Sequence, residues 1–251
     1  MRLLRLECLR RGEPLLATDG RWPALLATSV TVAIVGISLV TAQVLVAAAA
    51  TVGGIPGGLP GPAATVLFLL GMQATMIMLT LVAAGLDGKS ASTRLALAAS
   101  PLGGRALAEA VTAAIVLVAL YTAIVTATGL TDIVTDLRPF IGLMQSPVWP
   151  LAVLTVAVGA PISEEMLFRG YLLPALARSR LGMRGAALLS TLAWTGLHAG
   201  YSAAGMVEVF LIGLYFCWLL WRSGSLRLPI ACHVAVNSAT LCLIALLPVA
   251  R

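Results

Sequence analysis

Two adjacent carboxylates and an arginine stand inside a long apolar stretch of the sequence. Glu164 and Glu165 are followed by Arg169, and residues 151–160 before them carry no charge. Placing one charged side chain in hydrocarbon costs at least about 2.5 kcal/mol on insertion scales, so the group points to function. Glu165 and Arg169 are four positions apart, which places them on one helix face. This spacing predicts a supporting ion pair and leaves Glu164 rotated by about 100°, free for chemistry.

The other residues suited to chemistry form two further i, i+4 pairs in later apolar stretches. Trp194 precedes His198, and His233 precedes Asn237. The chain has only two histidines, and both lie in these stretches. A carboxylate can activate a water, an imidazole can orient that water or protonate a leaving amine, and a carboxamide N–H can stabilise an oxyanion. Hydrolysis of a peptide bond uses all of these roles.

The same side chains also match a second mechanism. Glu164, His198 and His233 have the composition of a catalytic zinc site with one open position. The sequence has no HExxH motif, which excludes a zincin helix, and no serine in a GxSxG elbow. The residue types leave a glutamate mechanism and a zinc mechanism both open.

The composition places these groups in a membrane. Of 251 residues, 60% are hydrophobic and 10% are charged, whereas a typical soluble domain has about 25% charged residues. The net charge of +6 comes from basic residues that fall between apolar runs. That distribution indicates orientation in a bilayer. We therefore expect a multi-pass protein of the cell membrane, in contact with lipid and without a nucleic-acid partner.

Seven stretches approach the length of about 20 apolar residues that a spanning helix needs. The sequence predicts an all-α, polytopic bundle of about seven transmembrane helices. With the N-terminus in the cytoplasm, fourteen of the sixteen basic residues face the cytoplasm, as the positive-inside rule requires. The predicted spans are Ala24–Thr51, Ala63–Leu86, Ala106–Thr128, Val148–Phe168, Arg184–Gly200, Ala204–Trp221 and Pro229–Val249.

The polar chemistry divides the chain into two regions. The first three spans contain one acidic residue, Glu109, and the candidate groups all follow residue 160. We expect a transmembrane scaffold over residues 1–147 and a catalytic core over residues 148–249. A transporter relay would spread ionisable groups over both halves, and the chain shows no internal repeat. Glu208 is expected at the outer interface, with no role assigned.

Three motifs, in this order and spacing, carry a family resemblance: EEMLFRG, WTGLHAG and SGSLRLPIACHVAVN. They resemble the signature motifs of the CAAX protease and bacteriocin-processing (abortive-infection-like) intramembrane protease family, which includes the type II CAAX prenyl endopeptidases. The resemblance covers residues 148–249, and no motif of the family is found before them. The resemblance implies an all-helical intramembrane endopeptidase.

Carried over motif by motif, the resemblance implies a role for each candidate residue. Glu164 would activate the water with the help of His198, and His233 with Asn237 would stabilise the oxyanion. Trp194 stands where phenylalanine is commoner in the family. The supporting residues would be Glu165, Arg169 and Trp194.

The resemblance also implies partners and an alternative function. The substrate would be a peptide or a membrane protein, and prenylated CAAX-type peptides are the family archetype. The mechanism proposed for the prenyl proteases is metal-free, which favours that route over zinc, whose ligands would be Glu164, His198 and His233. The alternative is a membrane protein of bacteriocin immunity or a scaffold, in which catalysis is dispensable.

The depths of the two histidines pose a geometric problem. In a span that begins at Arg184, His198 lies about 21 Å along the helix, whereas His233 follows closely after Pro229. A shared site therefore requires the connector Arg222–Pro229 to dip into the bundle, or the fifth span to begin below the surface. We expect such a dip, with a water-filled cavity open to the cytoplasm.

Overall fold

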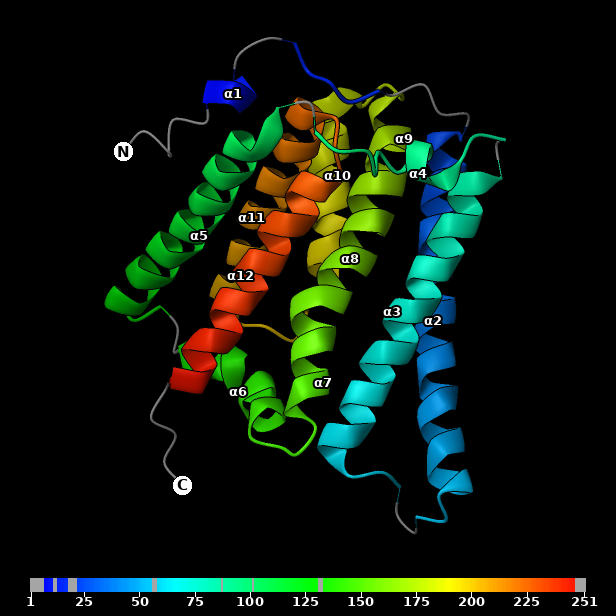
Figure 1. The fold of residues 1–251 in the computed structure, drawn as a ribbon, viewed down its shortest axis with the longest axis vertical. Helices are drawn as coiled ribbons and strands as arrows, with labels where there is room; N and C mark the ends of the chain where they lie inside the picture. Colours follow the sequence, from blue (N-terminus) through cyan, green and yellow to red (C-terminus); the bar gives the residue numbers. More distant parts are fainter. Residues whose placement is uncertain are drawn as a thin grey trace.

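Long apolar runs separated by glycine and proline form a bundle of helices (Figure 1). The structure is a computed structural model that describes residues 7–10, 13–17, 22–55, 58–86, 88–100, 102–130 and 133–246. Within these ranges no strand is present, and six helical segments are long and apolar enough to cross a membrane. The predicted all-α, multi-pass membrane bundle is thereby confirmed. The six segments are α2 (Ala24–Val52), α3 (Gly61–Gly85), α5 (Gly103–Ala127), the composite Trp149–Ala177, α11 (Ala203–Ser223) and α12 (Arg227–Leu246).

The predicted fifth span differs from the structure. Instead of a helix over Arg184–Gly200, the chain forms α10 (Gly182–Gly196), whose 15 residues fall short of the roughly 20 needed to span a bilayer. The helix ends because the next amides bond three residues back, Leu197 to Trp194 and His198 to Thr195. His198 therefore lies on a turn. The end of the predicted last span, residues 247–249, and Arg2, Arg5, Arg11 and Arg21 of the orientation count lie outside the described residues.

The composite segment Trp149–Ala177 carries the acidic motif and passes into the π-helical register twice. It consists of α7 (Trp149–Val153), the π-helix η2 (Leu154–Gly159), α8 (Ala160–Glu164), the π-helix η3 (Glu165–Leu172) and α9 (Leu173–Ala177). In η2 the Ala160 amide bonds five residues back to the Thr155 carbonyl. Such π segments are rare and occur frequently at functional sites.

The remaining long helices flank this segment. The antiparallel pair α2 and α3 packs on one side, and α5 lies on the opposite side beyond α11 and α12 (Figure 1). The pair approaches closely at Gly71, where an added Cβ would lie 3.3 Å from the Ala42 Cα. Small residues allow this because helix association in lipid depends on close backbone packing.

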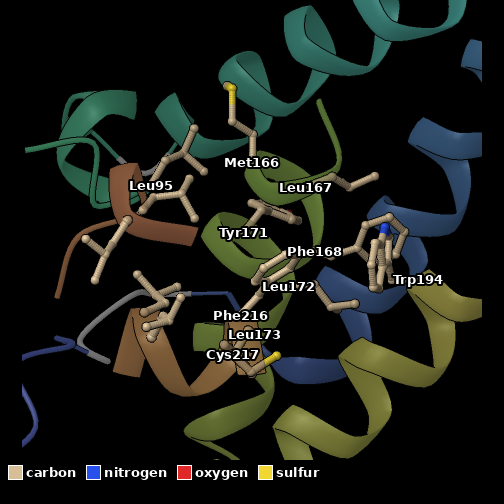
Figure 2. Close-up of a cluster of buried hydrophobic side chains, with 14 of the residues drawn as sticks. Leu95, Met166, Leu167, Phe168, Tyr171, Leu172, Leu173, Trp194, Phe216 and Cys217 are labelled. Carbon is tan, nitrogen blue, oxygen red and sulfur yellow. The ribbon is translucent and has the colours of Figure 1, made fainter. Parts of the chain in front are cut away.

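The centre of the apolar core is η3, all of whose residues are buried. Figure 2 shows its apolar side chains together with Trp194 of α10 and with Phe216 and Cys217 of α11. A segment buried on every side holds its polar residues inside the protein as well. Glu165 and Arg169 therefore have to find their partners within the core.

The connector between α11 and α12 is short and covered. It turns at Gly224, whose φ of +62° is left-handed, and the Leu226 amide then donates to the Ala96 carbonyl at 2.8 Å. An added Cβ at Gly224 would lie 2.7 Å from the Leu15 carbonyl oxygen, so residues 13–17 cross directly over the turn. The connector is thus buried at the upper end in Figure 1, the predicted cytoplasmic side. The water-filled cavity expected here stays a prediction.

Candidate active site

Glu164 lies near the middle of the composite segment Trp149–Ala177, which is long and apolar enough to cross a membrane. Its side chain is 8% exposed. The indole Nε1–H of Trp194 donates to the Glu164 Oε2 at 2.6 Å, a short bond of the kind that charged acceptors make. The Trp194 bond fixes the direction of the carboxylate and leaves its second oxygen for another partner.

Glu165 is the hub of a buried ion network. Its Oε1 accepts from Arg169 Nη1 at 3.1 Å and from His233 Nδ1 at 3.1 Å. Glu165 and Arg169 are fully buried, and breaking a buried pair by removing one partner costs about 3–5 kcal/mol. The predicted i, i+4 pair is present, and it also holds the imidazole of α12, which the spacing alone did not predict.

Arg169 is enclosed by α10 and α11. Its Nη2 donates to the Gly213 carbonyl at 3.3 Å, and its Cζ lies 4.2 Å from the centre of the Trp194 ring. Such cation–π contacts contribute about 2 kcal/mol or more when desolvated. The guanidinium thereby ties α11 to the indole that holds Glu164.

The two histidines meet through Trp194. Its ring centre lies 5.1 Å from that of His198 and 5.5 Å from that of His233, edge-on in both cases. His233 also stacks on Phe216 at 5.1 Å. The indole of Trp194 therefore contacts both imidazoles, so the two histidines lie in one cluster.

Both imidazoles are anchored through Nδ1. His198 Nδ1 lies 3.2 Å from the Trp194 carbonyl oxygen, and His233 Nδ1 lies 3.1 Å from Glu165. A carbonyl and a carboxylate only accept, so each Nδ1 is the donor. Each Nε2 is then directed away from its anchor and can act on a substrate.

Asn237 lies one turn after His233 on α12 and reaches η2. Its Nδ2 donates to the Val156 carbonyl at 2.8 Å. In the i→i+5 register that carbonyl would accept from residue 161, but Pro161 has no N–H. The carboxamide satisfies this backbone oxygen and retains one further N–H. No described contact joins Asn237 to Glu164 or to either histidine.

Two residues near the site went unnoticed in the sequence. Gln73 of α3, 3% exposed, donates from Nε2 to the Thr155 carbonyl at 3.1 Å. A Cβ added to Gly159 would overlap the Gln73 Oε1, so the carboxamide lies directly against the η2 backbone at this glycine. A carboxamide within an apolar span was the available signal.

The second is Tyr201, whose ring centre lies 5.4 Å from that of His198. Burial raises the pKa of the Tyr201 phenol, and the charges of Glu164, Asp136 and Glu208 raise it further. Its hydroxyl thus stays protonated near the catalytic candidates. Glu208 itself accepts from Thr122 Oγ1 at 3.0 Å, between α11 and α5.

A zinc site would need Glu164, His198 and His233 to converge on one point. Among the residues that the structure describes, no three His, Cys, Asp or Glu side chains converge on a point where they could hold one metal ion. Glu164 Oε2 is already bonded to the indole. Buried polar atoms without a partner lie beside the cluster instead, at Glu165 Oε2 and Thr195 Oγ1. Buried atoms of this kind are satisfied in proteins by ordered water.

Comparison with known proteins gives two matches. Residues 146–239 match the family model for Rce1-like type II CAAX prenyl endopeptidases, which confirms the predicted resemblance to the CAAX protease family. An uncharacterized 24.3 kDa protein of Escherichia coli is 36% identical over 91 residues. That alignment covers 35% of this chain and 42% of the relative, so the chain spans less than half of the protein it matches. No solved structure matches the chain.

Proposed function

We propose that this protein is an intramembrane endopeptidase related to the CAAX prenyl proteases, in which Glu164 activates the attacking water. The observation that carries the proposal is the buried Glu164 carboxylate, bonded to the Trp194 indole, whose ring contacts both imidazoles. The family match over residues 146–239 includes every residue of this cluster.

The proposed reaction begins at the second oxygen of Glu164. This oxygen removes a proton from a water molecule, and the water oxygen attacks the carbonyl carbon of the scissile peptide bond. His198 orients the water through Nε2, while its Nδ1–H is held by the Trp194 carbonyl. A fixed carboxylate and a fixed imidazole favour this step because they need no reorganisation when the water attacks.

Charge on the attacked carbonyl oxygen is stabilised from α12. His233 donates from Nε2 as the imidazolium, with Glu165 as its counter-charge at 3.1 Å, and Asn237 donates its second amide N–H. The C–N bond then breaks, and the proton held by Glu164 passes to the leaving amine. The balance is one water consumed, one carboxylic acid and one amine formed, and Glu164 returned to the carboxylate.

We propose a mechanism without a metal ion. The lack of a three-ligand cluster among the described residues supports it. Cleavage by the purified protein should persist in a strong chelator and should not rise on addition of zinc. Activity lost in chelator and restored by zinc would contradict this part of the proposal alone.

The substrate is proposed to be a peptide or a membrane-protein segment that reaches the site within the bilayer. A prenylated C-terminal peptide is the first candidate, because the matching family model is that of the prenyl endopeptidases. Paired peptides with and without the isoprenoid test this. Equal cleavage of both would favour an ordinary membrane-protein segment.

The deciding experiment removes the charge of Glu164 without changing its size. The purified Glu164→Gln protein should lose cleavage by at least about 10³-fold, since a general base alone contributes about 10²–10⁴-fold. Glu109→Gln is the matched control, a buried glutamate of α5 bonded to Arg105 of the same helix, and it should cleave normally. Full cleavage by Glu164→Gln would refute the mechanism and favour the immunity or scaffolding alternative.

A further inference from the structure

The turn that carries His198 is held from outside the family-matched segment. α6 (Ile133–Met144) lies at the lower end of the bundle in Figure 1 and precedes residue 146, where the family match begins. Its Asp136 accepts from the Ser202 amide and from Ser202 Oγ, both at 2.7 Å. Both carboxylate oxygens thus bind one residue, which fixes that residue in position and in orientation.

Ser202 is the residue at which α11 begins. It is the N-cap of that helix, and its Oγ accepts from the Gly205 amide at 3.0 Å. The same hydroxyl donates to Asp136, so capping and the link to α6 use one side chain. The contact is close-fitting, because a Cβ added to Gly205 would lie 2.4 Å from Asp136 Oδ2.

The turn between Gly196 and Ser202 is held at both ends. At its start the Trp194 carbonyl accepts from the Leu197 amide and from His198 Nδ1. In its middle the Tyr201 amide donates to the His198 carbonyl at 2.9 Å. At its end Asp136 holds Ser202. Without Asp136, Ser202 would lose both bonds that tie this end of the turn to α6.

We infer that Asp136 is a positioning residue for His198, acting through Ser202 and the turn between α10 and α11. This inference rests on the proposed function, in which His198 orients the attacking water. The N-terminal region then supplies part of the active-site geometry as well as a scaffold. Loss of Asp136 should shift His198 and Tyr201 together and leave Glu165 and His233 in place, because α12 holds those through separate bonds.

The histidine content allows a direct test. The chain has two histidines, so ¹⁵N-histidine labelling gives two imidazole spin systems, which His198→Gln assigns. In Asp136→Ala and Asp136→Asn, the His198 ring signals should change while the His233 signals stay as in the wild type. Arg138→Ala, an exposed residue of the same helix, is the matched control and should change neither.

Cleavage kinetics give the second measurement. Because misplacing a catalytic group by about 1 Å costs about 10²-fold, Asp136→Ala should lower kcat by about 10- to 100-fold. KM should change by less than about threefold, because Asp136 makes no proposed contact with substrate. Gly205→Ala displaces the carboxylate without removing it and should reproduce both effects if Asp136→Ala does not fold.

Two results would overturn the inference. One is an Asp136→Ala protein with wild-type His198 signals and wild-type kcat. The other is an equal change in both histidines together with a lowered melting temperature, which would show a general stabilising role. This test can fail independently of the proposed function. Full cleavage by Glu164→Gln would refute the glutamate mechanism, whereas the His198 signals still report whether Asp136 holds the turn.

Discussion

Gly213 of α11 lies where the helix backbone meets the site, and replacing it by alanine tests the arrangement most directly. An added Cβ would lie 2.8 Å from Arg169 Nη2, 2.7 Å from Thr191 Cγ2 and 2.8 Å from Trp194 Cζ3. These three side chains are at most 2% exposed. Because all three are packed in the core, the added methyl group requires a shift of α11 or of these side chains.

Two opposing effects determine how much Gly213→Ala changes the free energy of unfolding. Ordinary contacts of a Cβ begin at 3.4 Å, so the neighbours must give way by several tenths of an ångström, and overpacking of this kind costs about 1–3 kcal/mol. Alanine recovers about 0.5–1 kcal/mol of helix propensity. We expect a net loss of about 0–2.5 kcal/mol in the free energy of unfolding. Displacement of Trp194, which holds Glu164, should lower kcat/KM by about 10- to 100-fold.

The assay compares cleavage and thermal unfolding in one detergent, with Gly36→Ala as the matched control. Gly36 is also inside a transmembrane helix, but no atom lies within 4 Å of its added Cβ. The control should keep wild-type cleavage and be equally or slightly more stable. Wild-type kcat/KM and stability in Gly213→Ala would refute the close approach of α11 to Arg169 and Trp194.

Three further substitutions test the bonds within the site. Trp194→Phe keeps an aromatic ring and removes the N–H that donates to Glu164. Because hydrogen bonds to charged groups contribute about 1.5–3 kcal/mol, kcat/KM should fall by about tenfold or more. An unchanged kcat/KM would contradict a positioning role of Trp194. Glu165→Gln removes the counter-charge of His233 and should lower kcat more than KM, whereas a pure rise in KM would argue against that role. Arg169→Lys keeps the charge but cannot reproduce the planar fork that meets Glu165 and the α11 carbonyl; the melting temperature should fall, and an unchanged melting temperature would refute the fork contact.

Local spacing predicted those features that depend only on helix geometry. Glu165 and Arg169 pair because residues four apart share a helix face, and the structure contains that pair. Trp194 and His198 also pack, but His198 lies on the turn after α10 and is held there by the bond from its Nδ1 to the Trp194 carbonyl. Of the seven spans predicted from the apolar runs, six correspond to segments long and apolar enough to cross a membrane. They could be predicted because length and hydropathy are properties of a segment taken alone.

Contacts between distant segments could not be predicted in this way. Trp194 was read as a ring beside His198, and the structure adds its N–H bond to Glu164, 30 positions away. Asn237 was assigned to the oxyanion, and the structure shows its amide on the Val156 carbonyl. In a π-helix the Val156 carbonyl would accept from the residue five positions later, which is Pro161 and has no N–H. The carbonyl therefore needs another donor. Apolar periodicity in the sequence does not reveal a π-helix, so this need could not be predicted.

The sequence by itself determined that this is a helical membrane protein and which seven side chains are its chemical candidates. It could do so because charge in hydrocarbon is costly and is retained only for a purpose. Only the tertiary structure decided which candidates contact one another. Trp194 contacts Glu164, His198 and His233, and α10 is a short helix that ends in the turn of His198. The physical reason is that a polar group buried in a bundle takes the nearest donor or acceptor that packing brings to it. For Ser202, beside that turn, the partner is Asp136, from a helix that no family motif marks.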